Sequence, residues 1–489
     1  MIKLHQGDCR EVLAKLPAES VQTCVTSPPY YGLRAYLPDG HPDKASEIGL
    51  EQSPAEYVAQ LVEVFREVRR VLRTDGTVWL NLGDSYATQG GAHGGRADNQ
   101  TGVGAKRTHL AGAGDQRPRS PAPGLKPKDL MMIPARVAIA LQEPWHVGPI
   151  KREVDRAWLA GFVDGDGCIG IRQQANGEWN PTYIPYLTVG SSDTALLERC
   201  VAITGLGSVN QKSSAGDTDA RGIKQRRDGF TWRLDGQIAS RVIRDIYPYL
   251  VQKKPQALVC NAMNLSQGEP RPTKTRPVAA DIVAYRSDLY VKIKALNQRQ
   301  LVDLGNLPAV EPNIEPGFYL RSEIIWSKSA PMPESVRDRP TCAHEKVWLL
   351  TKAATYFYDA DAVAEQADPK NHRSSPGVRD TPPGQAQHSG YKEGRFFETR
   401  NLRNVWHLNP EPFPGAHFAT MPATLAERCI KAGSRPGDTV LDPFAGAGTT
   451  LLVADRLQRD AVGIELNADY CALIRKRLAS DAPLLSEVA

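Results

Sequence analysis

The sequence predicts an α/β protein with a mostly parallel, doubly wound sheet, into which a second domain is inserted. Two observations support this. Short β-rich runs alternate with helical runs at both ends of the chain, as in parallel strands joined by crossover helices. Between them, residues 145–316 break the alternation, and removing them joins residues 140–144 to residues 317–326 in a helix–turn–strand connection of ordinary length. We therefore expect three segments, 1–144, 145–316 and 317–489, of which the first and third form one domain.

The composition is that of an ordinary soluble globular chain. Of its 489 residues, 41% are hydrophobic and 24% are charged, and no apolar run approaches the ~20 residues that a membrane span needs. The eight cysteines are scattered without a Cys-x-x-Cys pair, which argues against a zinc site or a disulfide framework. We expect a cytoplasmic protein in a reducing environment, with no membrane partner. The net charge of +5 says little about nucleic-acid binding, although segment 145–316 carries most of the excess.

The first part of the chain reads as alternating strands and helices. Residues 21–25 are a short β-rich run that ends in a Pro-Pro loop. Residues 54–73 have helical periodicity with charges on one side, and residues 77–82 read as a second buried strand. The Gly-rich stretch 89–126 has no periodicity and is expected to be a loop, and a helix is expected over residues 127–142.

The last part of the chain resumes this alternation. Its polar segment 365–400 lacks periodicity and is expected to be irregular. A helix is expected over residues 451–457. Strands are expected at residues 324–326, 347–350, 438–441 and 461–464.

A glycine-rich turn follows the strand at residues 438–441. Glycine has no Cβ, so a strand–turn–helix junction of this kind lets the backbone approach a nucleotide-type ligand closely. Glu465 lies 17 residues after Gly448 at the end of the next strand, where a carboxylate can accept both hydroxyl hydrogens of a ribose. The third glycine of the dinucleotide pattern is missing, which favours S-adenosyl-L-methionine, a cofactor without a pyrophosphate, over NAD; a purely structural turn is the alternative. The expected cofactor-binding residues here are Asp442, Pro443, Phe444, Gly446, Gly448, Thr449 and Glu465.

Residues 26–30 read Thr-Ser-Pro-Pro-Tyr, directly after the first β-rich run. The amino nitrogen of adenine or cytosine is a poor nucleophile because its lone pair is delocalised into the ring. Two acceptors aimed at its hydrogens can localise that pair, and the Ser27 hydroxyl and the Pro28 carbonyl are suitable. Pro28 and Pro29 hold the loop rigid, and Tyr30 offers a face on which a base flipped out of the duplex can stack. With the cofactor loop, these four catalytic residues predict methyl transfer to an amino group of a base; a structural Pro-Pro turn is the alternative.

The order of the motifs, catalytic first and cofactor last, resembles the β-class DNA amino-methyltransferases over about residues 1–144 and 317–489. The resemblance implies a Rossmann-like methyltransferase sheet, S-adenosyl-L-methionine as cofactor and double-stranded DNA as substrate, in a prokaryotic or phage-encoded restriction-modification setting. It also implies that Asp8 lies near the cofactor adenine and that Phe418 bounds its methionine end.

The target base follows from position 27. Serine there is more typical of N4-cytosine members of the family, so cytosine N4 is expected and adenine N6 is the alternative. Methylation at cytosine C5 is not expected, because that chemistry uses a thiolate, usually after proline, and no cysteine here follows a proline. The polar segments 89–126 and 368–400 are candidates for base recognition by position alone.

Within the insert, residues 158–167 read Trp-Leu-Ala-Gly-Phe-Val-Asp-Gly-Asp-Gly. A helix with small residues on one side is expected, and the two aspartates at its end point into that side, where they could hold a divalent cation against a DNA phosphate. The segment resembles the LAGLIDADG homing endonucleases, which implies an α+β domain with Asp166 as a ligand of Mg²⁺. By the same resemblance, Asp193 is a second polar active-site position, after a DNA-facing strand at 186–189, and Lys253 is a cation for the transition state.

The LAGLIDADG-like motif occurs once in the chain. The resemblance therefore implies a homodimer through this helix, with two-fold symmetry on a pseudo-palindromic site. An intein is not expected, because Trp145 is no splicing nucleophile and no His-Asn pair closes the insert. Three readings stay open: an insert that cleaves DNA, an insert that only adds DNA contacts, and a homing endonuclease whose host no longer methylates.

Overall fold

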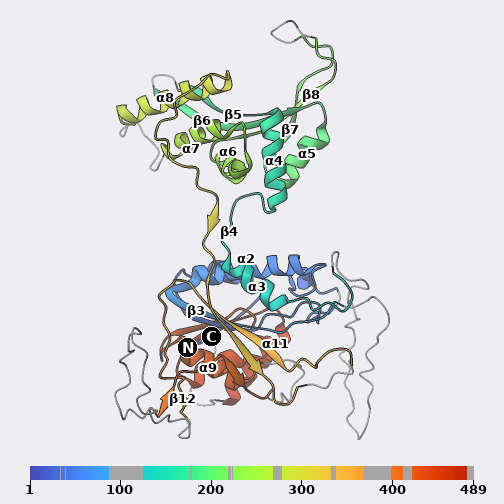
Figure 1. Cartoon of the computed structure of the whole chain (residues 1–489), viewed down its shortest axis with the longest axis vertical. Helices are drawn as coiled ribbons and strands as arrows, with labels where there is room; N and C mark the ends of the chain where they lie inside the picture. The colour runs from blue at the N-terminus through green and yellow to red at the C-terminus, as the bar shows by residue number, and fades with distance from the viewer. Residues whose placement is uncertain are drawn as a thin grey trace, which may run out of the picture. The chain divides into compact units, whose positions relative to one another are not determined.

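The chain divides into two compact units in the computed structural model (Figure 1). One unit comprises Met1–Glu143 and Gly317–Ala489, and the other is Pro144–Pro316. None of the helices among the described residues is long and apolar enough to cross a membrane. The structure describes residues 1–33, 35–38, 40–87, 125–176, 179–218, 222, 224–267, 278–331, 337–367, 398–410 and 421–481.

The first unit is built on a mostly parallel sheet, which confirms the predicted fold class. Its described strands, in spatial order, are β1 (Ile2–Gln6), β16 (Asp460–Glu465), β15 (Thr439–Asp442), β2 (Val21–Thr26), β3 (Leu72–Leu82), β11 (His344–Thr351), β10 (Tyr319–Ser327) and β14 (Val405–His407). In this spatial order, neighbouring strands from β1 through β16, β15 and β2 to β3 are parallel, whereas β11 is antiparallel to both β3 and β10. Every residue of β2 is buried, because this strand lies inside the sheet with helices over both faces.

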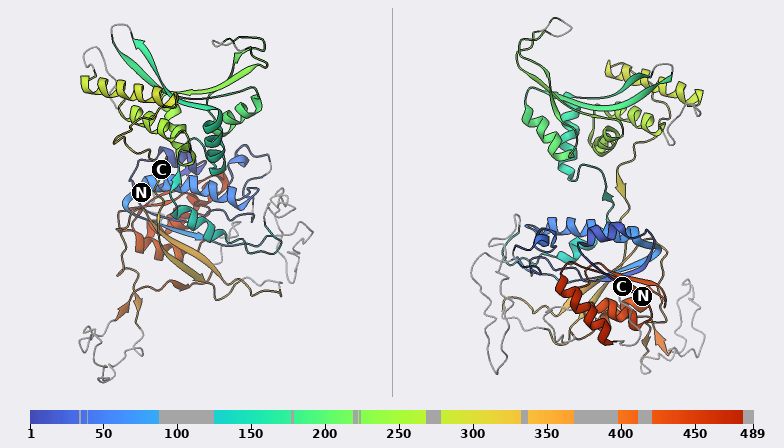
Figure 2. Two further views of the ribbon diagram at one scale, coloured as in Figure 1. Left: turned by 45° about the horizontal axis from the view of Figure 1, so that its top comes forward. Right: turned by 180° about the vertical axis from the view of Figure 1, so that it is seen from behind.

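Helices cover both faces of this sheet. The views in Figures 1 and 2 place α2 (Pro54–Val71) and α3 (Ile133–Gln142) on one face and α9 (Ala423–Gly433) and α11 (Ala468–Asp481) on the other. Among the described residues, the other α-helices of the unit are α1 (Cys9–Lys15), which packs against α2, and α10 (Thr449–Arg456), which packs against α9. The doubly wound arrangement predicted from the alternating pattern is therefore present.

The boundaries of two predicted helices are wrong by a few residues. The first, α2, begins with a capping box between Ser53 and Glu56 and ends at Val71, because β3 already starts at Leu72. The second, α3, begins at Ile133 rather than at residue 127. The preceding residues instead run beside residues 85–87, with Ala87 donating to the carbonyl of Asp129, so they cannot continue a helix.

The second unit is an α+β domain, as predicted, and its four-stranded sheet is antiparallel. Its sheet has the order β5 (Gly167–Asn176), β6 (Trp179–Ser191), β8 (Gly229–Asp235) and β7 (Val209–Ser213). Figure 2 shows helices gathered on one face of this sheet. The helices are α4 (Glu153–Asp166), α5 (Thr194–Thr204), α6 (Gly236–Ile246), α7 (Lys254–Leu265) and α8 (Ala280–Asn297).

A small two-stranded sheet closes the insert at its ends. Strand β4 (Trp145–His146) pairs antiparallel with β9 (Ile314–Glu315), and the Val147 amide donates to the Asn313 carbonyl. The entry and exit of the segment therefore lie side by side, as an insertion into a surface turn requires. In the first unit, β12 (Glu365–Gln366) and β13 (Thr399–Arg400) likewise pair at the two ends of the polar segment that was expected to be irregular, whose residues 368–397 lie outside the described part.

Candidate active site

The catalytic-loop and cofactor-loop residues lie together at the carboxyl ends of two neighbouring strands. Strands β2 and β15 are parallel and adjacent, although more than 400 residues separate them. The Thr26 hydroxyl at the end of β2 donates to Oδ1 of Asp442 at the end of β15 over 2.6 Å, and both side chains are buried. The carboxyl ends of parallel strands at such a point are where open α/β sheets bind ligands.

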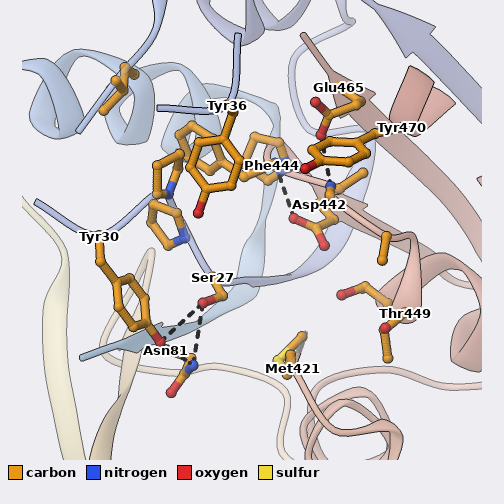
Figure 3. Close-up of a pocket in the computed structure, with 18 of the residues that line it drawn as sticks. Ser27, Tyr30, Tyr36, Asn81, Met421, Asp442, Phe444, Thr449, Glu465 and Tyr470 are labelled. Carbon is orange, nitrogen blue, oxygen red and sulfur yellow. Dashed lines mark hydrogen bonds between the residues drawn. The ribbon is translucent and has the colours of Figure 1, made fainter. Parts of the chain in front are cut away.

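A cavity of about 780 Å³ opens beside these two loops (Figure 3). Gly448 stands beside this cavity without lining it, and Phe418 lies outside the described residues. The predicted residues that line it are Asp8, Ser27, Pro28, Pro29, Tyr30, Asp442, Pro443, Phe444, Gly446, Thr449 and Glu465.

Contacts with Tyr57 and Gly49 hold the Ser27–Tyr30 loop in place. The Tyr57 hydroxyl on α2 donates to the Pro29 carbonyl over 2.8 Å. Gly49 packs against Pro29 so closely that a Cβ there would lie 3.3 Å from the proline ring and the Tyr30 carbonyl. These contacts and the two proline rings leave the loop little freedom, as a preorganised set of acceptors requires.

A polar network that the sequence did not predict surrounds Tyr30. Its hydroxyl donates to Oε2 of Glu345 over 2.5 Å, and Asn81 Nδ2 donates to the same hydroxyl over 3.0 Å. Glu345 forms an ion pair with Lys328, and the Tyr30 ring packs against Gly83, where a Cβ would come within 2.5 Å of the ring. Burial, with the nearby Glu345 carboxylate, raises the pKa of Tyr30 well above its ordinary value.

A weak signal for Asn81 and Glu345 was present in the sequence. Both stand at or beside the ends of strands that were predicted from the sequence. Their contacts with Tyr30 depend on which strands are neighbours in the sheet, and the local sequence pattern does not reveal the strand order.

The glycine-rich turn has the conformation of a ligand-binding loop. Gly446 and Gly448 both have positive φ, and a Cβ on Gly448 would lie 2.8 Å from Ile474 of α11. The Gly446 amide donates to Glu465 over 2.8 Å, and the Asn467 amide donates to its other oxygen over 2.8 Å. Each carboxylate oxygen keeps a free lone pair, so Glu465 can still accept ribose hydroxyls. These residues fit a ribose-bearing cofactor.

Two carboxyl groups face this region, of which Asp442 is buried and Glu465 is half-buried. Burial raises the pKa of Glu465 to about 7, and neighbouring Asp442 adds to the effect. Burial also raises the pKa of Asp442 to about 6, although hydrogen bonds from Thr26 and the Phe444 amide oppose the rise. Another carboxylate at the cavity, Asp8, differs: it caps α1 and pairs with the Arg10 guanidinium.

We expect Asp442→Asn to stabilise the folded protein by roughly 3 kcal/mol at pH 8. A carboxyl whose folded pKa is raised contributes stability that is fully present below its unfolded pKa and is lost as the pH rises through its folded pKa of about 6. The advantage of the asparagine variant should therefore shrink as the pH falls from 6 towards 4. Denaturant unfolding at several pH values measures it. Asp469→Asn, at the exposed first turn of α11, is the control and should show no such trend.

In the second unit, Asp166 ends α4 with an exposed side chain. Lys253 lies beside this end of the helix, where its Nζ donates to the Asp164 carbonyl over 2.6 Å. Asp193 is the N-cap of α5, where its carboxylate accepts from the Ala195 amide. Among the described residues, no group of three or more His, Cys, Asp or Glu side chains is placed to hold a metal ion.

The other aspartate at this helix end, Asp164, is hydrogen-bonded to a neighbouring loop: its carboxylate accepts from the backbone amides of Val251 and Lys253 over 2.6 and 2.9 Å. It fixes the loop that carries Lys253. The small residues Ala157, Gly161 and Gly165 lie exposed along α4, and no atom lies within 4 Å of a Cβ built on either glycine.

Comparison with known proteins finds a matching family for each of the two parts of the chain. The sequence profile of the DNA methylase family, of N6/N4 type, matches residues 21–140 and 307–476, more than half of the chain. The profile of the LAGLIDADG endonucleases matches residues 159–226. Type II methyltransferase M.SmaI from Serratia marcescens is 28% identical over 477 residues, which cover 97% of this chain and 90% of that protein. The DNA adenine methyltransferase YhdJ of Escherichia coli K12 is 29% identical over 175 residues, covering 35% of this chain and 57% of that protein.

Solved structures of both kinds resemble the chain at low sequence identity. The cytosine-N4-specific PvuII DNA methyltransferase is 14% identical with a TM-score of 0.39, over 100% of this chain and 88% of that one. The homing endonuclease I-CvuI, bound to its target, is 22% identical with a TM-score of 0.23, over 32% of this chain and 87% of that one. From the profile match over more than half its length, the chain belongs to the family of N6/N4 DNA methylases and carries a LAGLIDADG endonuclease domain within it.

Proposed function

We propose that the protein transfers a methyl group from S-adenosyl-L-methionine to the N4 amino group of a cytosine flipped out of double-stranded DNA. The observation that carries this proposal is that one cavity is lined by both the Ser27–Tyr30 loop and the glycine-rich turn. In that cavity, groups that accept amino hydrogens face the residues that would hold a cofactor. The cofactor, when bound, supplies an electrophilic methyl carbon on a sulfonium.

The residues divide into two roles in this proposal. The Ser27 hydroxyl and the Pro28 carbonyl accept hydrogen bonds from the amino group, while Tyr30 packs against the flipped base. The glycine-rich turn from Asp442 to Thr449 lies against the cofactor, Glu465 holds its ribose, and Asp8 and Phe418 bound its two ends. The buried Asp442 carboxylate also favours a cationic ligand in the same cavity.

Serine at position 27 favours cytosine N4 over adenine N6. We expect nucleosides from unmodified DNA, treated with the protein and methyl-labelled cofactor, to contain labelled N4-methyldeoxycytidine. Mass spectrometry of the digested DNA separates this product from N6-methyldeoxyadenosine, which would correct the base. Absence of any methylated nucleoside would contradict the methyl-transfer proposal itself.

A second proposed function belongs to the insert: Mg²⁺-dependent cleavage of DNA. It is favoured by the exposed Asp166 and by basic side chains on the sheet face opposite the core. Arg172 and Arg233 alternate with buried Ile171 and Trp232, so they lie on that outer face, where Arg233 stacks 4.7 Å over Tyr186. Such a face can contact phosphates and bases. We further propose that two chains pair through the small residues of α4, which brings two Asp166 side chains to one duplex.

A further inference from the structure

The proposed methyl transfer creates a proton that the catalytic loop cannot keep. Once the amino nitrogen is methylated it carries one proton too many. The Ser27 hydroxyl and the Pro28 carbonyl can accept hydrogen bonds, but neither is a base of useful strength at neutral pH. The proton therefore needs another acceptor, and a carboxylate of this unit has the required basicity. Asp442 lines the same cavity, but its hydrogen bonds run to Thr26 and the Phe444 amide, away from Ser27.

Glu345 is connected to Ser27 by hydrogen bonds. Ser27 Oγ donates to the Tyr30 hydroxyl over 3.5 Å, and Tyr30 donates to Glu345 Oε2 over 2.5 Å. Asn81 Nδ2 lies 3.3, 3.0 and 3.1 Å from the oxygens of Ser27, Tyr30 and Glu345, respectively. Figure 3 shows Ser27, Tyr30 and Asn81 converging at one end of the cavity. The first link is long, as catalytic hydrogen bonds often are before the substrate is bound.

We infer that Glu345 takes up the proton released from the methylated amino group, through Ser27 and Tyr30, with Asn81 holding the three oxygens together. This inference rests on the proposed methyl transfer. Glu345 does not touch the base and acts only through Tyr30. It is therefore a positioning residue and not a catalytic one. It was predicted neither as a catalytic nor as a cofactor-binding residue.

The step balances in atoms and charge. As the bond between nitrogen and the methyl carbon forms, the sulfur–methyl bond breaks and its electron pair remains on sulfur. The nitrogen then gives a proton to Ser27 Oγ, Ser27 gives its own hydroxyl proton to Tyr30, and Tyr30 gives its proton to Glu345. Both hydroxyls are restored, the methylated base is neutral, and Glu345 becomes a carboxylic acid that later releases the proton to water.

The surroundings of Glu345 and Tyr30 suit this task. Lys328 forms an ion pair with Glu345, which compensates the carboxylate charge, and its ammonium lies 4.6 Å from the Trp326 ring centre. The buried Tyr30 hydroxyl has a pKa well above its ordinary value, so it passes a proton on without becoming a phenolate. Hydrogen-bond chains in such a site strengthen one another.

A purely structural role for Glu345 makes different predictions. If Glu345 only held the Tyr30 ring in place, glutamine would replace it well, because its amide has the same length and can still accept the tyrosine hydrogen bond. Aspartate would replace it badly, because it is shorter. If Glu345 instead accepts the proton, aspartate should replace it better than glutamine, because aspartate keeps a carboxylate and glutamine does not.

The test uses the full chain, unmethylated plasmid DNA and methyl-labelled S-adenosyl-L-methionine, with protein in excess over DNA sites. Single-turnover rates are compared for wild type, Glu345→Gln, Glu345→Asp, Tyr30→Phe and the double variant Glu345→Gln/Tyr30→Phe. Cofactor Kd and the thermal midpoint are measured beside each rate. Glu323→Gln is the matched control, because Glu323 also pairs with a lysine between β10 and β11, Lys346 at 2.6 Å, but does not line the cavity.

We expect Glu345→Gln and Tyr30→Phe each to be slower than wild type by about 100-fold, with cofactor Kd unchanged. The double variant should be no slower than the slower single variant, because both interrupt one chain. Glu345→Asp should be faster than Glu345→Gln, and Glu323→Gln should match wild type.

Three results would overturn the inference. These are a wild-type rate for Glu345→Gln, a faster rate for glutamine than for aspartate at position 345, and effects of the two single variants that multiply in the double variant. The failure of the proposed function looks different. If wild type itself transfers no methyl group to DNA, the proposed function falls and the inference falls with it, whereas a methylating wild type with an equally fast Glu345→Gln removes the inference alone.

Discussion

Ser27→Ala should slow methyl transfer by about 100-fold or more while leaving cofactor affinity nearly unchanged. The Ser27 hydroxyl is one of the two acceptors proposed to localise the lone pair of the amino nitrogen, and it is held in the cavity by Asn81 Nδ2. The residues proposed to bind the cofactor lie on the neighbouring strand and its turn, so they keep their contacts. Single-turnover methylation of DNA and equilibrium binding of the cofactor measure the two quantities separately.

The matched control for this variant is Ser20→Ala. Ser20 is an exposed serine just before β2 that donates to the Pro17 carbonyl, so its loss should not change the rate. Pro28→Ala keeps the carbonyl but loosens the loop, and we expect a smaller loss than for Ser27→Ala. Normal methylation by both loop variants would show that the Ser27–Tyr30 loop is not the catalytic loop.

Asp166→Asn should reduce Mg²⁺-dependent DNA cleavage by about 1000-fold or more and leave methylation unchanged. The reason is that an amide cannot supply the negative charge that holds a divalent cation against a phosphate. Asp166 is exposed at the end of α4, so its replacement should not unfold the domain. The measurement is cutting of a DNA library with Mg²⁺, beside methylation of the same DNA.

Two further variants sharpen this test. Asp281→Asn, at the exposed first turn of α8, controls for the loss of a surface charge and should cut like wild type. Gly161→Arg places a large cation on the small-residue face of α4 and should prevent both pairing of two chains and cutting, as sedimentation and the same library show. Absence of cutting by wild type with Mg²⁺ would instead favour a domain that only contacts DNA.

The fold was largely predictable because it depends on repeated local patterns. The alternation of strands and helices predicted the parallel sheet, and the break in that pattern predicted an insert at residues 145–316. The errors lie at helix ends. Residue 127 was placed in a helix that begins only at Ile133, because pairing with residues 85–87 draws the preceding chain into another conformation. Such pairing is tertiary and overrides local propensity.

The candidate site was predictable in part for a similar reason. The Ser27–Tyr30 loop and the Asp442–Thr449 turn are short segments whose chemistry can be read from their own residues. The roles of Asn81, Lys328 and Glu345 cannot be read in this way, because their positions at or near strand ends do not say which groups they meet. They reach Tyr30 because β3 pairs with β11 in one register and β11 with β10 in another.

The sequence by itself determined the reactive groups, the order of the strands and helices that carry them, and the presence of an inserted domain. The tertiary structure alone decided which groups meet. Thr26 and Asp442 bond across 416 positions, and Asn81 and Glu345 across 264. The physical reason is that a side chain's chemistry is fixed by its own covalent structure, whereas its hydrogen-bond partners are fixed by sheet order and register, which arise from packing of the whole unit.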